Sequence, residues 1–134
     1  MKTVTKWKKK HEFESSQDHH TIQIDGSRQH AISPKALLLS ALAGCSGVDV
    51  VDILTKMRVE FSDMEIEVET TQTETTPKIF RDIHITYIIN TDKENEGKVK
   101  KAIELSLEKY CGVSAMLRKN SAIDYKLLIK DGTA

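Results

Sequence analysis

The first 25 residues carry isolated hydrophobic positions among polar neighbours, which is the pattern of short strands. These positions are Val4, Trp7, Phe13, Ile22 and Ile24. Turn-like sequences interrupt them at residues 9–11 and 17–20. The pattern therefore predicts three short strands, followed by a loop over residues 26–33.

A long apolar segment with helical periodicity follows the loop. Ser33 is a suitable N-cap, and Pro34 suits the first helical position because the N–H that it lacks would have no intrahelical partner there. The helix predicted for residues 34–57 is apolar on nearly every side up to Cys45. Such a helix needs neighbours all round it, and a chain of 134 residues supplies few. We therefore expect a homodimer with this helix at its centre.

The second half of the chain alternates between strand-like and helix-like patterns. Two strand-like runs come first, with apolar positions at Val59, Phe61, Met64, Ile66 and Val68, and then at Ile83, Ile85, Tyr87 and Ile89. Helical periodicity follows over residues 94–110, with one face formed by Val99, Ile103, Leu107 and Tyr110, and a short helix then groups Val113, Met116 and Leu117. A last strand is marked by Ile123, Tyr125, Leu127 and Ile129. The predicted order, βββ-α-ββ-α-α-β, is that of an α+β fold in a single domain, 1–134.

Composition and charge narrow the class of function. The chain has 20 lysine and arginine residues and 20 aspartate and glutamate residues, so its formal net charge is zero. Nucleic-acid binding draws on a basic surface, and we therefore expect no nucleic-acid partner. The basic run formed by Lys6 and residues 8–10 is interpreted as a solvated hairpin tip.

The cellular setting is predicted from three features. Residues 1–10 lack the apolar core of a secretory signal. Glycine, serine and aspartate interrupt the longest apolar segment, which argues against a membrane span. Two cysteines are too few for a disulfide framework in a domain of this size. We therefore expect a cytoplasmic, reducing environment and no membrane partner.

The two cysteines are the first candidates for chemistry. Cys45 lies between Gly44 and Gly47, which weaken the helix and leave space beside the sulfur. Cys111 precedes Gly112 near the start of a helix, where unpaired N–H groups can lower the pKa of a thiol. A thiolate reacts with peroxides, and a second thiol can then close a disulfide. Inert packing of each cysteine is the alternative, because unmodified cysteine is often buried.

The histidines give little support for a metal site, and the cysteines lack a zinc-type spacing. His19 and His20 are adjacent, so on a strand they would point to opposite faces. His30 lies near Arg28 in the loop before the long helix, and His84 is expected to face water. We predict no metal and no cofactor.

Two segments together resemble the OsmC/Ohr family of osmotically induced and organic-hydroperoxide-resistance proteins. The segments are SPKALLLSALAGCSGVDVVDIL and YCGVSAMLRKNSAIDYKLLI, and the resemblance extends from about Ile22 to Ile129. It implies an intertwined homodimer, in which sheets from both chains wrap two central helices. It also implies a thiol-dependent peroxidase that reduces organic hydroperoxides and is itself reduced by a dithiol. By position, Cys45 would attack the peroxide and Cys111 would resolve the product.

The sequence departs from the family pattern at the start of the long helix. The family's peroxidases pair the reactive cysteine with an arginine and with a glutamate that follows the proline, but here Lys35 and Ala36 follow. Arg28 is the candidate for the arginine, with a solvated surface arginine as the alternative.

Asp49 and Asp52 share a helix face with Cys45, so either carboxylate could replace the missing glutamate if a cation such as Arg28 or Lys35 bridged it to the thiol. Hydrogen bonds between the aspartates and neighbouring backbone or groups of the partner chain are the simpler interpretation. A non-catalytic dimer that binds a small apolar ligand is therefore the alternative function.

Overall fold

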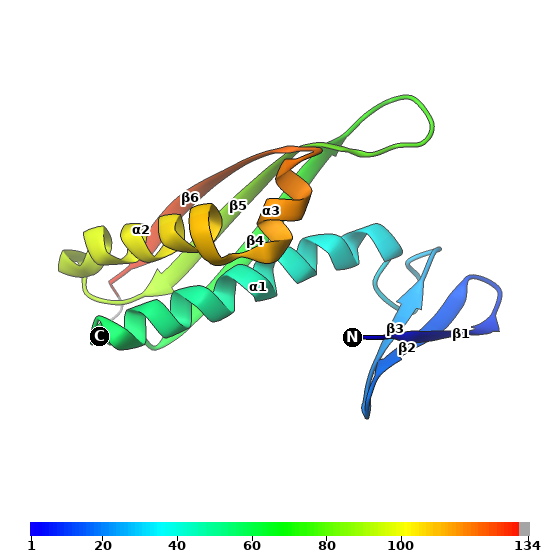
Figure 1. The fold of residues 1–134 in the computed structure, drawn as a ribbon, viewed down its shortest axis with the longest axis horizontal. Coiled ribbons are helices and arrows are strands. Elements are labelled where there is room, and N and C mark those ends of the chain that lie inside the picture. Colours follow the sequence, from blue (N-terminus) through cyan, green and yellow to red (C-terminus); the bar gives the residue numbers. More distant parts are fainter. Residues whose placement is uncertain (132–134) are drawn as a thin grey trace. The chain divides into compact units, whose positions relative to one another are not determined.

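The computed structural model describes residues 1–131 and has the predicted α+β order (Figure 1). Its strands are β1 (Val4–Lys9), β2 (Glu12–Gln17), β3 (His20–Asp25), β4 (Asp63–Gln72), β5 (Phe80–Asn90) and β6 (Ala122–Lys130). Its helices are α1 (Pro34–Lys56), α2 (Glu96–Leu105) and α3 (Gly112–Arg118), with a 3₁₀ turn η1 (Lys93–Asn95) and a π-helical segment η2 (Ser106–Tyr110). The chain divides into two compact units, Met1–Leu39 and the part from Ser40 onward. The assignment of a single domain stays a prediction.

The first unit contains the antiparallel sheet β1-β2-β3. Its register aligns Trp7, Phe13 and Ile24 on one face, and Ile22 belongs to the same face two residues along. These residues form an apolar sheet face that is largely exposed: Trp7 keeps 66% and Ile22 keeps 48% of its surface. The alternation therefore predicted the strands correctly, but this chain leaves their apolar face open.

The second unit contains the sheet β4-β5-β6, in which β5 is antiparallel to β4 and parallel to β6. The three α-helices lie on one side of it (Figure 1). The core between the two layers is formed by Leu42, Val50 and Leu54 of α1, by Ile83, Ile85, Tyr87 and Ile89 of β5, and by Val99, Ala102 and Ile103 of α2. By length and composition α1 could also cross a membrane, and the face that carries Leu42, Val50 and Leu54 is buried.

Three sequence expectations differ from the structure. Val59 and Phe61 precede β4 instead of belonging to it, although Val59 is buried. Tyr110 was expected on the buried face of its helix and is 56% exposed. The π-helical turn causes this, because it adds a residue to the turn and rotates the following side chains. Met116, expected to pack with its neighbours, is 66% exposed.

Candidate functional site

Cys45 lies on α1 between the buried face of the helix and an exposed apolar stripe. With about 100° between successive residues, Leu42 and Ser46 point into the core, while Ala41 and Val48 point outward. Cys45 lies between these two directions and is accordingly half-buried. Its sulfur is therefore positioned to meet both the protein interior and a molecule that approaches from outside.

The two glycines beside Cys45 have different roles. A Cβ added to Gly44 would meet no atom of the described residues within 4 Å, so this side of the helix is open. A Cβ added to Gly47 would lie 3.2 Å from Cδ1 of Ile66, which is closer than most real contacts. Gly47 thus allows α1 to approach β4, and Gly44 leaves the expected space near the thiol.

Cys111 is the N-cap residue of α3 and is buried, with 3% of its surface exposed. The Ser114 N–H donates to its sulfur at 3.4 Å, as expected for a thiol at the start of a helix. Burial nevertheless raises the pKa of Cys111, and this effect outweighs the hydrogen bond from Ser114, which lowers it. The helix start thus lowers this pKa as expected, but burial has the larger influence and reverses the net direction.

The structure brings the two thiols together although 66 positions separate them in the chain. A side-chain hydrogen bond joins Cys45 and Cys111, and after burial and the Ser114 contact it is the next influence on Cys111, raising its pKa further. A thiol with a raised pKa keeps its proton and can donate it in a hydrogen bond to the other sulfur. The arrangement brings together one half-buried and one buried cysteine.

A cluster of hydroxyl groups lies beside the thiols. Ser46 Oγ is 2.6 Å from the phenol oxygen of Tyr87 and 2.9 Å from Ser106 Oγ. Ser106 Oγ also donates to Asp49 Oδ2 at 2.9 Å. Burial raises the pKa of Tyr87 to about 12, so its phenol keeps its proton at neutral pH. The four residues, which we call the hydroxyl chain, connect α1, β5 and the π-helical segment.

The two aspartates of α1 thus have different surroundings. Asp49 is half-buried and accepts a hydrogen bond from Ser106, whereas Asp52 is exposed. Asp49 is thus hydrogen-bonded, as the simpler interpretation expects, but its partner is a side chain of η2 in the same chain and not the neighbouring backbone or a group of the partner chain. Both aspartates line a groove of about 340 Å³, which is completed by Ile53, Lys56, Met57, Leu105 and Tyr110.

Arg28 lies in the first unit, whereas both thiols belong to the second. It has a φ of 61°, a left-handed conformation that side chains rarely adopt, and its loop folds around Asp25. The carboxylate of Asp25 accepts hydrogen bonds from the backbone and hydroxyl of Ser27 and from the N–H groups of Gln29 and His30. The Ser27 hydroxyl above all holds the pKa of Asp25 well below its usual range. These hydrogen bonds hold the loop that carries Arg28 in its conformation.

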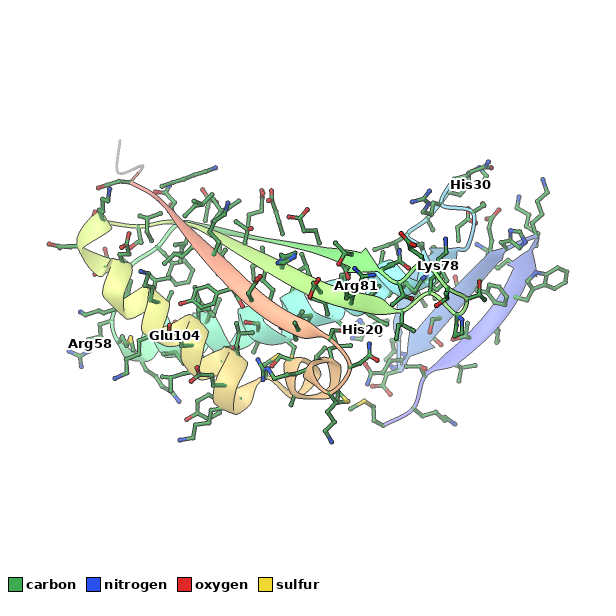
Figure 2. The ribbon with its side chains drawn as sticks, turned by 90° about the horizontal axis from the view of Figure 1, so that it is seen from above. His20, His30, Arg58, Lys78, Arg81 and Glu104 are labelled. Carbon is green, nitrogen blue, oxygen red and sulfur yellow. The ribbon has the colours of Figure 1, made fainter. Side chains whose placement is uncertain are left out.

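The same loop places three potential metal ligands near one another. Within residues 1–131, one ligand atom each from Glu12, Asp25 and His30 lies within 4.8 Å of the others. His30 Nδ1 is 3.3 Å from Glu12 Oε2 (His30 is labelled in Figure 2). Because both oxygens of Asp25 already accept two hydrogen bonds each, this carboxylate has little capacity left for a metal ion. We interpret the group as an anchor for the loop.

Sequence reasoning missed Ser46, Tyr87, Ser106 and Arg118. Ser46 is fully buried on an otherwise apolar helix face, and Ser106 is fully buried too, so a serine in an apolar stripe was the available signal. Arg118 donates to the carbonyl of Leu107 at 3.0 Å and thereby braces the turn before Cys111. No local pattern pairs these residues, because their partners lie far away in the chain. His84, expected to face water, is partly exposed and bonds to Asp124 at 2.6 Å.

Comparison with known proteins places these features in a family. A model of the family described as "OsmC-like protein" matches residues 25–126. Protein YhfA of Escherichia coli K12 is 35% identical over 121 residues, which are 89% of this chain and 90% of YhfA.

Solved structures are similar over nearly the whole chain. A hypothetical protein from Aquifex aeolicus VF5 is 30% identical, with a TM-score of 0.82 and 97% of each chain covered. An OsmC-like protein from Mycoplasma pneumoniae has a TM-score of 0.83 at 16% identity, covering 96% of this chain and 95% of that one. The organic hydroperoxide resistance protein OhrB of Bacillus subtilis has a TM-score of 0.62 at 20% identity, with 96% of each chain covered. A match of the family model over most of the chain, together with this fold, shows that the protein belongs to the OsmC-like family.

Proposed function

We propose that this protein is a thiol-dependent peroxidase that reduces organic hydroperoxides in stress defence, with Cys45 and Cys111 as its redox pair. The observation that carries the proposal is the contact between two thiols 66 positions apart, of which one is accessible and one is buried. Membership of the OsmC-like family and the likeness in fold to organic hydroperoxide resistance proteins support it.

The different surroundings of the thiols support the roles proposed for them. Cys45 is half-buried on the open side of α1 and acts as the attacking thiolate. Cys111 keeps its proton, because burial raises its pKa, and its S–H stabilises a negative sulfur at Cys45. A resolving thiol also reacts as its thiolate, so Cys111 gives up this proton as it attacks the oxidised Cys45.

The reaction then proceeds in two balanced steps. The Cys45 thiolate attacks the outer oxygen of the hydroperoxide, the O–O bond breaks, and the alkoxide leaves as an alcohol after taking up a proton. Cys45 is now a sulfenic acid. Cys111 attacks this sulfur, a disulfide forms, and hydroxide leaves with the thiol proton as water. A dithiol reductant returns both residues to thiols and is itself oxidised to a disulfide.

Arg28 is proposed as the cation that stabilises the Cys45 thiolate and the polarised O–O bond. The ordered loop around Asp25 supports this role, since it holds the backbone of Arg28 in an otherwise unfavourable conformation. In this proposal Arg28 takes over part of the task of the glutamate that is absent after Pro34.

The protein is further proposed to act as a homodimer in the cytoplasm, where a reducing environment would sustain the thiols. The exposed stripe on α1 supports this: Val48 and Val51 keep 62% and 37% of their surface, and Ala41 and Gly44 are also exposed. A second copy would cover the stripe, as well as the apolar sheet face of the first unit, and Cys45 borders the stripe. Analytical ultracentrifugation tests the dimer.

A non-catalytic ligand-binding role is the second candidate, and one observation favours it. The groove near Asp49 combines apolar side chains of Ile53, Met57 and Leu105 with an aromatic ring, which suits a small apolar molecule. The departure at Lys35 and Ala36 supports the same candidate. Its thiols would then react with peroxides no faster than free cysteine does.

One experiment separates the two candidates. Reduced protein is mixed with cumene hydroperoxide or with hydrogen peroxide, and free thiols are followed over time. We expect rapid loss of both thiols with cumene hydroperoxide and a Cys45–Cys111 disulfide in the mass spectrum. Cys45→Ser should abolish the reaction, and Cys111→Ser should allow one turnover followed by over-oxidation. Thiol loss at the rate of free cysteine would exclude the peroxidase.

Arg28 has a matched control in Arg58, which is exposed and has a φ of 59°. Arg28→Ala should slow the attack of Cys45 on the hydroperoxide about 10-fold or more, since one stabilising charge is lost. Arg58→Ala should leave this rate unchanged (Arg58 is labelled in Figure 2). Equal rates in the two variants would remove Arg28 from the mechanism.

A further inference from the structure

We propose that Ser106 is a positioning residue that holds Cys111 against Cys45 and thereby sets the rate at which the disulfide closes. This inference rests on the proposed function and extends it to residues outside the thiol pair. It is carried by the contacts of the hydroxyl chain and by the π-helical turn that follows Ser106.

Ser106 is attached to α1 by its side chain. Its Oγ lies 2.9 Å from Ser46 Oγ and donates to Asp49 Oδ2 at 2.9 Å, with the Ser46 carbonyl at 3.5 Å. Ser106 and Ser46 are both fully buried. Ser46 directly follows Cys45 in the chain, so the hydroxyl of Ser106 is fixed to the turn of α1 that carries the attacking thiol.

Every hydroxyl group of the hydroxyl chain can donate its hydrogen in the same direction, towards Asp49. Because an ionised carboxylate only accepts hydrogen bonds, the Ser106 hydroxyl points its hydrogen at Asp49. The Ser46 hydroxyl can then donate to Ser106 Oγ, and the phenol of Tyr87 can donate to Ser46 Oγ at 2.6 Å. Each hydroxyl then donates once, and the hydroxyl chain ends at the Asp49 carboxyl group.

Ser106 is attached to Cys111 by its backbone. The Cys111 N–H donates to the Ser106 carbonyl at 2.7 Å, which is the five-residue spacing of a π-turn. The turn is braced from the other side: the Leu107 carbonyl accepts from Ser114 Oγ at 3.1 Å and from Arg118 at 3.0 Å. One residue therefore links the helix of Cys45 to the backbone of Cys111.

Disulfide formation depends on the position of Cys111, which the link through Ser106 holds. A disulfide forms only when the two Cα atoms lie about 4.4–6.8 Å apart with suitable side-chain directions. If the π-turn relaxed into an α-helical turn, the residue after it would rotate by about 100°. Cys111 would leave Cys45, and the Cys45 sulfenic acid would meet a second hydroperoxide, which gives sulfinic acid and an alcohol.

The central variant is Ser106→Ala, and its matched control is Ser121→Ala. Ser121 is also a buried serine in the second unit, and it donates to the Phe80 carbonyl at 2.9 Å, away from the thiols. Asp49→Asn retains an acceptor for Ser106 and tests rescue of the bond without the charge. Folding of each variant is checked by circular dichroism and urea unfolding.

Two readouts are measured, of which one does not depend on peroxidase activity. The first is the equilibrium between the protein disulfide and dithiothreitol, which reports how well the thiols are placed. The second is single-turnover kinetics with cumene hydroperoxide, which separate the attack of Cys45 from the closure by Cys111.

For Ser106→Ala we expect the rate of disulfide closure to fall about 10-fold. The equilibrium constant for disulfide formation should fall by the same factor, because one buried hydrogen bond is lost. The attack rate should change less than about twofold and sulfinic acid should accumulate, since attack does not require Cys111. Asp49→Asn should lie nearer the wild type, and Ser121→Ala should match it.

If Ser106→Ala folds poorly, Tyr87→Phe is used instead. It removes the hydroxyl group at the end of the hydroxyl chain that lies opposite Asp49. Disulfide closure should then slow about threefold, because the Ser106–Asp49 hydrogen bond remains.

The outcomes decide between the two proposals. Unchanged closure and an unchanged equilibrium in Ser106→Ala would overturn the positioning role. Equal losses in Ser106→Ala and Ser121→Ala would also overturn it, since general destabilisation would then explain them. If the wild-type protein does not react with hydroperoxide, the proposed peroxidase function is overturned. If Ser106→Ala still shifts the dithiothreitol equilibrium in that case, the positioning of the thiols by Ser106 is supported.

Discussion

The two three-stranded sheets of this protein have similar sequence patterns and very different surroundings. In β5, four alternate residues from Ile83 to Ile89 are at most 1% exposed, because α-helices cover that face (Figure 1). In the first unit, every residue of β1 is exposed, and the apolar face with Trp7 and Ile22 is open. The comparison teaches that alternation defines an apolar face but does not supply its cover. We infer that a second copy of the chain covers the sheet of the first unit.

The largest expected effect comes from a matched pair of substitutions, Ile85→Ala and Ile22→Ala. Ile85 is 1% exposed, so its truncation leaves a cavity and should lower the free energy of unfolding by about 3 kcal/mol. Ile22 is 48% exposed, and its truncation should cost less than about 1 kcal/mol in the isolated chain. Urea unfolding measures both values.

Measuring both variants at several protein concentrations tests whether a second copy of the chain covers Ile22. The proposed dimer predicts that the cost of Ile22→Ala grows as the concentration of protein is raised, because the wild type then gains stability by association. The cost of Ile85→Ala should depend less on concentration. Equal costs for the two variants at the lowest concentration would mean that the chain itself covers Ile22.

A smaller effect is expected from the buried phenol of the covered sheet. Burial raises the pKa of Tyr87 to about 12, against about 10 in the unfolded chain, so the folded state favours the protonated phenol. Its contribution to stability is therefore complete below pH 10 and is lost as the pH rises towards 12. The loss should reach about 2 kcal/mol at pH 12.

The measurement for Tyr87 is the urea midpoint between pH 9 and 12 in the wild type and in Tyr87→Phe. The difference between the two proteins should shrink or change sign as the pH rises, since the variant has no phenol to ionise. A difference that stays constant over this range would contradict the raised pKa. Tyr125, which donates to Glu104 at 2.9 Å, remains as a common background (Glu104 is labelled in Figure 2).

The smallest effect concerns the other face of the covered sheet. His84 of β5 bonds to Asp124 of β6 at 2.6 Å, and this bond above all raises the pKa of His84. Its contribution to stability is present below pH 6.5 and is lost as the pH rises through the raised pKa. Asp124→Asn should lower the pKa of His84 in an NMR titration, with little change in the urea midpoint.

Asp63→Asn, at an exposed position at the start of β4, is the control for this titration and should leave His84 unchanged. An unshifted His84 in Asp124→Asn would show that the histidine and the aspartate are not paired in solution.

Much of the fold could be predicted because its signals are local. Period-two alternation marked β1, β2 and β3, and the pair Ser33 and Pro34 marked the start of α1, since strand faces and helix starts depend on neighbouring residues. The π-helical turn had no such signal. Helical periodicity predicted that Tyr110 would be buried, and one inserted residue reversed the outcome.

The candidate site also has some features that the sequence predicted and others that it did not. The sequence singled out Cys45 and Cys111 as possible reactive thiols, and the resemblance to a family paired them. Their contact, and the greater burial of Cys111, required the packing of η2 onto α1. The partners in the hydroxyl chain are 41 and 60 positions from Ser46, beyond the reach of any local pattern.

By itself, the sequence determined where the backbone becomes strand or helix and which faces are apolar, because steric preferences and side-chain periodicity act between near neighbours. Only the tertiary structure decided which of those faces are covered, how far burial raises the pKa of Cys111 and which hydroxyls meet. These properties depend on burial and on contacts between distant segments, so they are fixed when the helices pack on the sheet.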